Sequence, residues 1–195
     1  LILLCGRAFL DRGDTAVAGT PTYPLYEIAT LQAGAVFQSV PSRPPDFAFP
    51  GDEAIRAARD AELVWLCTPS NPIGNQIDTM VVEAIIAATD GLVVLDAAYA
   101  EFSDQDWSEA VDNHHNLIVL RTLSKAFGIA GARVGYAMAH PDLIAALDGV
   151  RPPGSISSTS VDLALAALDS PIRIRRTVDD LAALRSELAA GLQGL

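Results

Sequence analysis

The chain has 195 residues, is 50% hydrophobic and carries a formal net charge of −11 at pH 7. This length and apolar content suit one domain with a real core, whereas the acidic balance argues against nucleic-acid binding, which normally needs a basic face. With two cysteines, Cys5 and Cys67, and no apolar run near the roughly 20 residues that span a bilayer, the sequence predicts a cytoplasmic protein without membrane partners.

Short apolar runs rich in β-branched residues alternate with alanine- and leucine-rich segments of helical spacing. This alternation is typical of βαβ units and predicts an α/β fold with a mainly parallel sheet. The predicted strands are Thr15–Gly19, Ala35–Val40, Leu63–Cys67, Leu92–Asp96, Leu117–Arg121 and Arg133–Ala139. The predicted helices are about Tyr23–Ala33, Asp52–Arg59, Thr79–Thr89, Pro141–Leu147 and Ser160–Leu168.

After Ile174 the pattern changes to apolar residues at helical spacing, which predicts one long helix. These residues are Val178, Leu181, Leu184, Leu188, Leu192 and Leu195. We expect residues 1–170 to form one domain, incomplete at its N-terminus, and residues 171–195 to lead to a further small domain. A terminal helix that caps the same domain is the alternative. The chain lacks an initial methionine and starts in what reads as mid-helix, so we expect a piece of a longer protein.

Lys125 is the single lysine of the chain, because the other twelve of the 13 basic residues are arginine. Arginine stays protonated and forms no Schiff base, whereas a lysine amine can lose its proton and attack an aldehyde. A chain that keeps one primary amine therefore suggests a chemical role for it. A surface lysine left in an arginine-rich composition is the competing interpretation.

Polar residues follow the predicted strands, where ligands of open parallel sheets bind. Asn71 lies in a rigid turn after the strand that ends at Cys67, although simple turn chemistry also explains an Asn-Pro pair. Asp96 ends an apolar run and should be buried with a cationic or hydrogen-bonding partner. A protonated ring nitrogen, a helix N-terminus or a structural ion pair would serve.

A phosphate cradle is predicted after the next strand, where Thr122 and Ser124 supply hydroxyls and Arg133 supplies a guanidinium fork. Glycines near these residues allow close backbone approach, although their spacing is neither that of a P-loop nor GxGxxG. An amine, a phosphate cradle, a carboxylate, an amide and the phenol of Tyr99 together match pyridoxal phosphate.

Three ordered segments carry a resemblance to a known family: Asn71–Gly74, Asp96–Tyr99 and Arg121–Tyr136. They resemble fold-type-I, class I/II aminotransferases that depend on pyridoxal phosphate, and within them the last segment is most similar to histidinol-phosphate aminotransferases. Pro21–Tyr26 resembles an upstream segment of the same enzymes. The resemblance covers essentially the whole chain and implies the three-layer αβα large domain of this family, truncated at both ends.

The resemblance also implies roles for individual residues. Lys125 would form the internal aldimine and later carry the proton between substrate and cofactor, and Asp96 would pair with the pyridinium nitrogen. The remaining cofactor contacts would be Asn71 and Tyr99 at the ring hydroxyl, Thr122, Ser124 and Arg133 at the phosphate, and Tyr23 and Ala98 on the two faces of the ring.

Three positions depart from the family pattern. Ile73 stands in Asn-Pro-Ile-Gly where threonine is usual, and Ala97 stands where glutamate is usual, but neither is assigned to the cofactor. Arg151–Ser155 replaces an Arg-Pro-Pro-Tyr-Asn segment near the substrate entrance, which puts specificity for histidinol phosphate in doubt. The resemblance implies that a glycine-rich phosphate-binding segment and a carboxylate-binding arginine lie outside the chain, so this piece alone is expected to be inactive.

The resulting hypothesis is transfer of an amino group from L-histidinol phosphate, or another amino phosphate or amino acid, to 2-oxoglutarate in histidine biosynthesis. Threonine-phosphate decarboxylase and aromatic-amino-acid aminotransferase are rivals with similar cofactor motifs. A non-catalytic aminotransferase-like domain of a transcription regulator is a third possibility. The family implies a homodimer. His114 and His115 fit a solvated loop before a strand, so we expect no metal site.

Overall fold

The computed structural model describes residues 1–192. The chain divides into two compact units. The first comprises Leu1–Thr122 and Gly135–Ser155, and the second comprises Leu123–Val134 and the chain from Ile156 onward.

The first unit is built on a six-stranded sheet with the order β2-β1-β3-β4-β5-β6. Strands β1 to β5 run parallel, and β6 pairs antiparallel with β5. The strands are β1 Thr15–Thr20, β2 Val36–Pro41, β3 Leu63–Cys67, β4 Leu92–Asp96, β5 Leu117–Thr122 and β6 Gly135–Ala139. The helices are α1 Ile2–Phe9, α2 Leu25–Gln32, α3 Gly51–Ala58, α4 Thr79–Ala88 and α5 Pro141–Val150, with single turns at η1 Ala100–Phe102 and η2 Ala110–Asp112.

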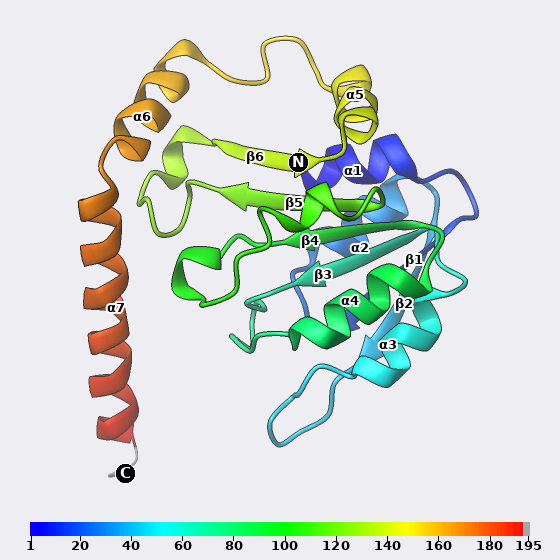
Figure 1. Ribbon diagram of the computed structural model, residues 1–195, viewed down its shortest axis with the longest axis horizontal. Helices are drawn as coiled ribbons and strands as arrows, with labels where there is room; N and C mark the ends of the chain where they lie inside the picture. Colours follow the sequence, from blue (N-terminus) through cyan, green and yellow to red (C-terminus); the bar gives the residue numbers. More distant parts are fainter. Residues whose placement is uncertain (193–195) are drawn as a thin grey trace. The chain divides into compact units, whose positions relative to one another are not determined.

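Two apolar cores lie on the two faces of this sheet. Side chains alternate along a strand, so Val64 of β3 joins the core under α3 and α4, while its neighbour Trp65 joins the core under α1, α2 and α5. In Figure 1, α3 and α4 lie in front of the sheet and α1 and α2 behind it. All five residues of β3 and of β4 are buried, as expected for central parallel strands covered on both faces. The unit is therefore a three-layer αβα fold.

Local chemistry explains where α4 begins and how closely α1 and α2 pack. Asp78 caps α4, because its carboxylate accepts a 2.8 Å hydrogen bond from the Met80 N–H. Gly6 lets α1 approach α2, since a Cβ at this position would lie 2.9 Å from the Ala29 carbonyl oxygen. A side chain there would force the two helices apart.

The second unit contains the segment that follows β5 and the last two helices. It includes the turn η3 Ala130–Ala132 and the helices α6 Ser158–Leu168 and α7 Pro171–Leu192. Its small core joins Leu123 to Ala164 and Ala167 of α6, with Phe127 and Ile129 packed against them. Arg173 of α7 donates a 3.0 Å hydrogen bond to the Phe127 carbonyl. The segment 123–134 is therefore a folded part of this unit.

The predicted α/β architecture is confirmed, and β3 and β4 have the predicted bounds. The last strand starts at Gly135 instead of Arg133, because Arg133 adopts a left-handed conformation with φ 56° at the end of η3. The helix expected from Tyr23 starts at Leu25. The long C-terminal helix is present as α7. Leu195, the last residue of its predicted apolar pattern, lies outside the described residues, and the role of residues 171–195 as a connection to a further domain stays a prediction.

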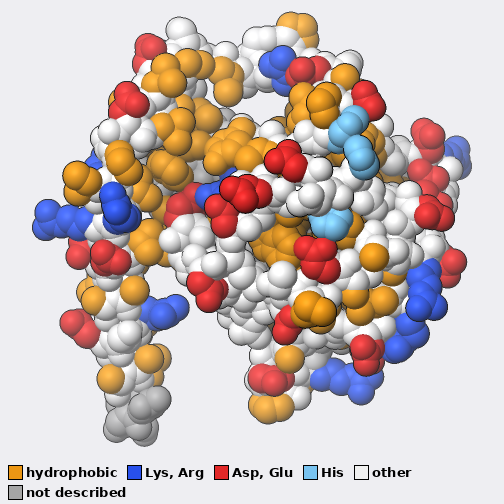
Figure 2. All heavy atoms as spheres, viewed as in Figure 1, with side chains coloured by type: hydrophobic (Ala, Val, Ile, Leu, Met, Phe, Trp, Pro, Cys, Tyr) orange, Lys and Arg blue, Asp and Glu red, His pale blue; other side chains and the backbone are white. Residues whose placement is uncertain are grey.

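No helix within residues 1–192 is both long and apolar enough to span a bilayer. Figure 2 shows acidic and basic side chains interspersed with apolar ones on the face in view.

Candidate functional site

The strand order creates a switch point between β1 and β3, since β2 lies on one side of β1 and all later strands on the other. Ligands of open α/β sheets bind outside the carboxyl ends of strands at such a point. Tyr23 and Asn71 follow β1 and β3, respectively, and Asp96 and Thr122 are the last residues of β4 and β5. Four of the predicted site residues therefore belong to the carboxyl edge of this sheet.

Asp96 is buried, with 8% of its surface exposed. The Tyr26 hydroxyl donates a 2.8 Å hydrogen bond to Oδ2, and the Ala98 N–H donates a 3.1 Å hydrogen bond to Oδ1. The expectation that Asp96 is buried with hydrogen-bonding partners is therefore confirmed. Such donors stabilise the ionised form of a buried carboxyl group.

Tyr26 was not predicted to be part of the site, yet it is fully buried. Its ring stacks on Trp65 of β3, with centroids 5.3 Å apart and planes at 13°. Trp65 Nε1 donates to Thr30 Oγ1 at 3.2 Å, and Thr30 Oγ1 donates to the Tyr26 carbonyl at 2.9 Å. One signal in the sequence could have found it, because Tyr26, Ala29 and Thr30 share the helix face that meets the sheet, and a buried phenol needs a partner.

Three buried groups beside Asp96 keep their protons. Burial raises the pKa of Tyr26 well above its usual value, and the charge of Asp96 adds to the rise. Burial, again with a contribution from Asp96, raises the pKa of Cys67 to about 11. Burial raises the pKa of Cys5 to about 12. The three groups whose pKa the charge of Asp96 raises are therefore a neutral phenol and two neutral thiols.

Tyr23 and Asn71, two of the predicted cofactor residues, lie in different surroundings. Tyr23 precedes α2, is 39% exposed and meets Tyr26 edge-on at 5.9 Å, so the core tyrosine of this segment is Tyr26. Asn71 is half-buried in a tight turn in which the Gly74 N–H donates to the Ser70 carbonyl at 2.9 Å. Gly74 has φ 85°, a conformation that favours glycine.

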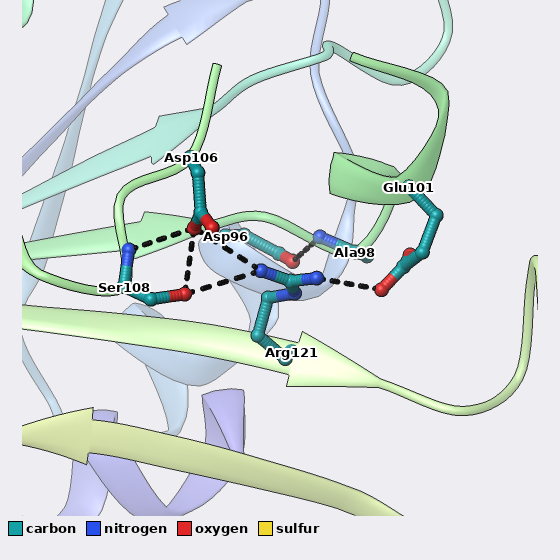
Figure 3. Close-up of polar contacts among 6 residues, drawn as sticks. All are labelled: Asp96, Ala98, Glu101, Asp106, Ser108 and Arg121. Atoms are coloured by element: carbon teal, nitrogen blue, oxygen red, sulfur yellow. Dashed lines mark hydrogen bonds and ion pairs between the residues drawn. The ribbon is translucent and has the colours of Figure 1, made fainter. Parts of the chain in front are cut away.

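Arg121 forms an ion-pair network that was also not predicted, and Figure 3 shows it beside Asp96 and Ala98. One guanidinium nitrogen lies 2.7 Å from Glu101 Oε1 and the other 3.7 Å from Asp106 Oδ1. Hydrogen bonds from the hydroxyl and the N–H of Ser108 lower the pKa of Asp106. Because Glu101 and Asp106 both belong to the loop between β4 and β5, Arg121 ties this loop, which also carries Tyr99, to the end of β5.

Ser124, Lys125 and Arg133 belong to the second unit. The Gly128 N–H donates to the Lys125 carbonyl at 2.9 Å, and the left-handed Gly128, with φ 70°, continues this turn. Lys125 is exposed, Ser124 is half-buried, and the Arg133 guanidinium donates to the Ala130 carbonyl at 3.1 Å. This unit therefore holds the amine, one of the two predicted hydroxyls and the arginine in one folded segment.

A small pocket lies near the switch point, with about 30 Å³ of water-accessible space. Its lining includes Thr22 after β1, Cys67 at the end of β3 and Ser70 after β3. None of the predicted cofactor residues lines it, and its volume suits a water molecule, not a cofactor. Ser70 Oγ is a buried polar atom without a hydrogen-bond partner within the described structure.

The described residues contain no group of three or more His, Cys, Asp or Glu side chains arranged to hold a metal ion. His114 instead contacts Glu83, with 3.0 Å between His114 Nε2 and Glu83 Oε2. His115 and His140 meet edge-on, with ring centroids 4.6 Å apart.

Comparisons with known proteins agree with this fold. The model of the family "Aminotransferase class I and II" matches residues 1–195. The histidinol-phosphate aminotransferase of Methanoculleus marisnigri is 39% identical over 173 residues, which are 89% of this chain and 49% of that protein. The corresponding enzyme of a Thermoanaerobacter species is 37% identical over 193 residues, which are 96% of this chain and 55% of that protein.

Among solved structures, the histidinol-phosphate aminotransferase of Sinorhizobium meliloti in complex with pyridoxal-5′-phosphate has a TM-score of 0.88 at 29% identity. The match covers 96% of this chain and 52% of that one. The chain thus spans about half the length of the relatives it matches. The ordered motifs, the sheet topology and these matches lead to one conclusion: the chain belongs to the class I and II aminotransferase family.

Proposed function

We propose that the protein containing this chain is a pyridoxal-phosphate-dependent aminotransferase of the cytoplasm, and that its amino donor is L-histidinol phosphate. Family membership supports the reaction type, and the two relatives named above at 37–39% identity support the donor. The observation that carries the proposal is the buried carboxylate of Asp96 at the end of β4, held by two hydrogen-bond donors.

The donor set fits the chemical groups of the cofactor. An ionised, buried carboxylate is the partner that a protonated ring nitrogen requires, and Asp96 accepts two hydrogen bonds of the kind that favour the charged form of a carboxyl group. Thr122, Ser124 and Arg133 would bind the phosphate, because hydroxyls and a guanidinium fork suit its oxygens. Asn71 and Tyr99 would hydrogen-bond the ring hydroxyl, while Tyr23 and Ala98 would contact the ring faces.

Lys125 is proposed to bind the cofactor covalently and to act as the acid and base of the reaction. When bound, pyridoxal phosphate supplies an aldehyde that condenses with amines and a ring that withdraws electrons. Lys125 Nζ would take a proton from the substrate carbon next to nitrogen and return it elsewhere on the conjugated system. Lys125 is the one side-chain amine in the chain with this ability.

The acceptor of the amino group is proposed to be 2-oxoglutarate and the pathway histidine biosynthesis, carried out by a homodimer. The phosphate of the proposed donor needs a cationic partner in the substrate site. Sedimentation of the full protein measures its mass in solution, and the proposed homodimer should have twice the mass of one chain.

A donor panel tests the proposal in the full protein. L-histidinol phosphate, phenylalanine and threonine phosphate are each mixed with the cofactor-loaded protein, and cofactor absorbance is followed without an acceptor. The proposal predicts conversion to the amino form by L-histidinol phosphate and restoration by 2-oxoglutarate. Release of carbon dioxide from threonine phosphate, or faster conversion by phenylalanine, would overturn the donor assignment. Failure of the protein to bind pyridoxal phosphate would overturn the reaction type.

A further inference from the structure

We propose that Tyr26 is a positioning residue, whose hydroxyl fixes the orientation and the ionised state of the Asp96 carboxylate that receives the cofactor ring nitrogen. This inference rests on the proposed function, in which Asp96 is the partner of that nitrogen. Its starting point is the 2.8 Å hydrogen bond from Tyr26 to Asp96 Oδ2, made between buried groups.

The position of the phenol is set by contacts of its ring with two aromatic side chains. One face stacks on Trp65, whose indole N–H donates to Thr30. Thr30 donates in turn to the Tyr26 carbonyl, so the stacked partner is tied to the same helix that carries Tyr26. Tyr23 and Tyr26 also form a T-shaped pair, with their ring planes at 84°. A fully buried side chain with these contacts has little freedom to rotate, so its hydroxyl is held in place.

The Tyr26 hydroxyl serves as a hydrogen-bond donor to the Asp96 carboxylate. Burial raises the pKa of its hydroxyl far above the physiological range, so the proton stays on the phenol. A donor at 2.8 Å favours the charged form of a carboxyl group over its neutral form. It also occupies Oδ2, while the Ala98 N–H occupies a lone pair of Oδ1, and these two bonds fix the plane of the carboxylate.

Two further titratable groups whose pKa the charge of Asp96 raises are Cys67 of β3 and Cys5 of α1, and the ion pairs of Arg121 with Glu101 and Asp106 lie beside Asp96 as well (Figure 3). Burial raises the pKa of Cys67 to about 11 and that of Cys5 to about 12, so both are neutral thiols at physiological pH. Their state does not change between pH 5 and pH 8. A change in this range that follows removal of the Tyr26 hydroxyl therefore does not come from these thiols.

The test compares Tyr26→Phe with the matched control Tyr136→Phe in the full protein. Tyr26→Phe keeps the ring that stacks on Trp65 and removes only the hydroxyl, whereas Tyr136 lies on β6 and is 39% exposed. Affinity for pyridoxal phosphate is measured at pH 7.5 by fluorescence titration. We expect Tyr26→Phe to bind about tenfold more weakly, the value of one hydrogen bond to a charged group. Tyr136→Phe should bind like the wild type.

The pH dependence separates positioning from packing. Without the Tyr26 donor, the neutral form of Asp96 becomes more favourable relative to the carboxylate. The pH at which cofactor affinity is lost on acidification should therefore rise by about one unit. Loss of packing would lower the affinity at every pH without changing the pH at which it falls on acidification. If neither this pH nor the affinity changes, the inference is overturned.

A double variant identifies the group through which Tyr26 acts. In an Asp96→Asn background, adding Tyr26→Phe should change cofactor affinity less than twofold, because the charge that Tyr26 serves is gone. Additive losses would contradict the inference. If Tyr26→Phe alone fails to fold, folding of the double variant still supports action through the carboxylate, and failure of both contradicts it. A wild-type protein that binds no pyridoxal phosphate would instead refute the proposed function itself.

Discussion

Tyr26 and Asp96 lie 70 residues apart in the chain and share a buried hydrogen bond of 2.8 Å. The bond links the second helix to the end of the fourth strand. It satisfies two groups that are both costly to bury alone, a phenol and a carboxylate. The candidate site is thus held by the core of the first unit as well as by its loops.

Replacing Asp96 by alanine should destabilise the protein even without cofactor. The change leaves the Tyr26 hydroxyl and the Ala98 N–H without the acceptor that each now uses. We expect a loss of about 1–3 kcal/mol in the free energy of unfolding. Urea unfolding followed by tryptophan fluorescence measures it. The control Asp60→Ala, at an exposed position, should stay within about 0.5 kcal/mol of the wild type, and an equal effect of both changes would contradict the argument.

Replacing Arg121 by methionine should destabilise the loop between β4 and β5. The Arg121 and Glu101 side chains are only 14% and 12% exposed, so Glu101 would be left as a poorly solvated charge. We expect a loss of about 2–3 kcal/mol, and the added change Glu101→Gln should recover part of it. Arg56→Met breaks an exposed pair with Glu53 and should cost less than about 0.5 kcal/mol. Hydrogen exchange of the loop amides locates the effect, and unchanged exchange would argue against a tie between Arg121 and the loop.

Replacing Gly6 by alanine should separate α1 from α2. An added Cβ would lie 2.9 Å from the Ala29 carbonyl oxygen, which is backbone and cannot swing away. We expect destabilisation of about 1–3 kcal/mol, measured by thermal unfolding. Gly149→Ala in α5 is the control, because nothing lies within 4 Å of its Cβ and alanine favours the helix by about 1 kcal/mol. A stabilised Gly6→Ala variant would show that the helices do not meet there.

Stability should fall at alkaline pH because buried thiols lose protons on unfolding. Burial raises the pKa of Cys67 from 9.0 to about 11, so its contribution is complete below pH 9 and is lost as the pH rises to 11. The loss should be about 1 kcal/mol per pH unit for this group. In Cys67→Ala the stability should decline less steeply between pH 9 and pH 11, while Cys5 still contributes. Equal slopes for variant and wild type would contradict the assignment.

Much of the fold was predictable because its signals are local. Strands β3 and β4 are continuous apolar runs, and their predicted bounds are those of the structure. The antiparallel direction of β6 has no local signal, since it depends on the folded segment 123–134 that brings the chain back along β5. The left-handed conformation of Arg133, which delays the start of β6, is equally set by its surroundings.

The candidate site likewise has features that the sequence could predict and features that depend on the folded structure. Asp96 was predictable as a buried carboxylate because it ends an apolar strand. Its partner Tyr26 was not, because only the packing of α2 on β3 brings the two together. The ion pair of Arg121 with Glu101 likewise joins a strand end to a loop whose path the sequence does not define.

The central claim is that Lys125 carries the cofactor. The full protein is incubated with pyridoxal phosphate, reduced with borohydride and digested, and the modified peptide is identified by mass spectrometry. The account predicts a stable adduct on Lys125, which is the single lysine of this chain, and no adduct at this position in Lys125→Arg. An adduct on another lysine of the protein, with Lys125 unmodified, would contradict the account.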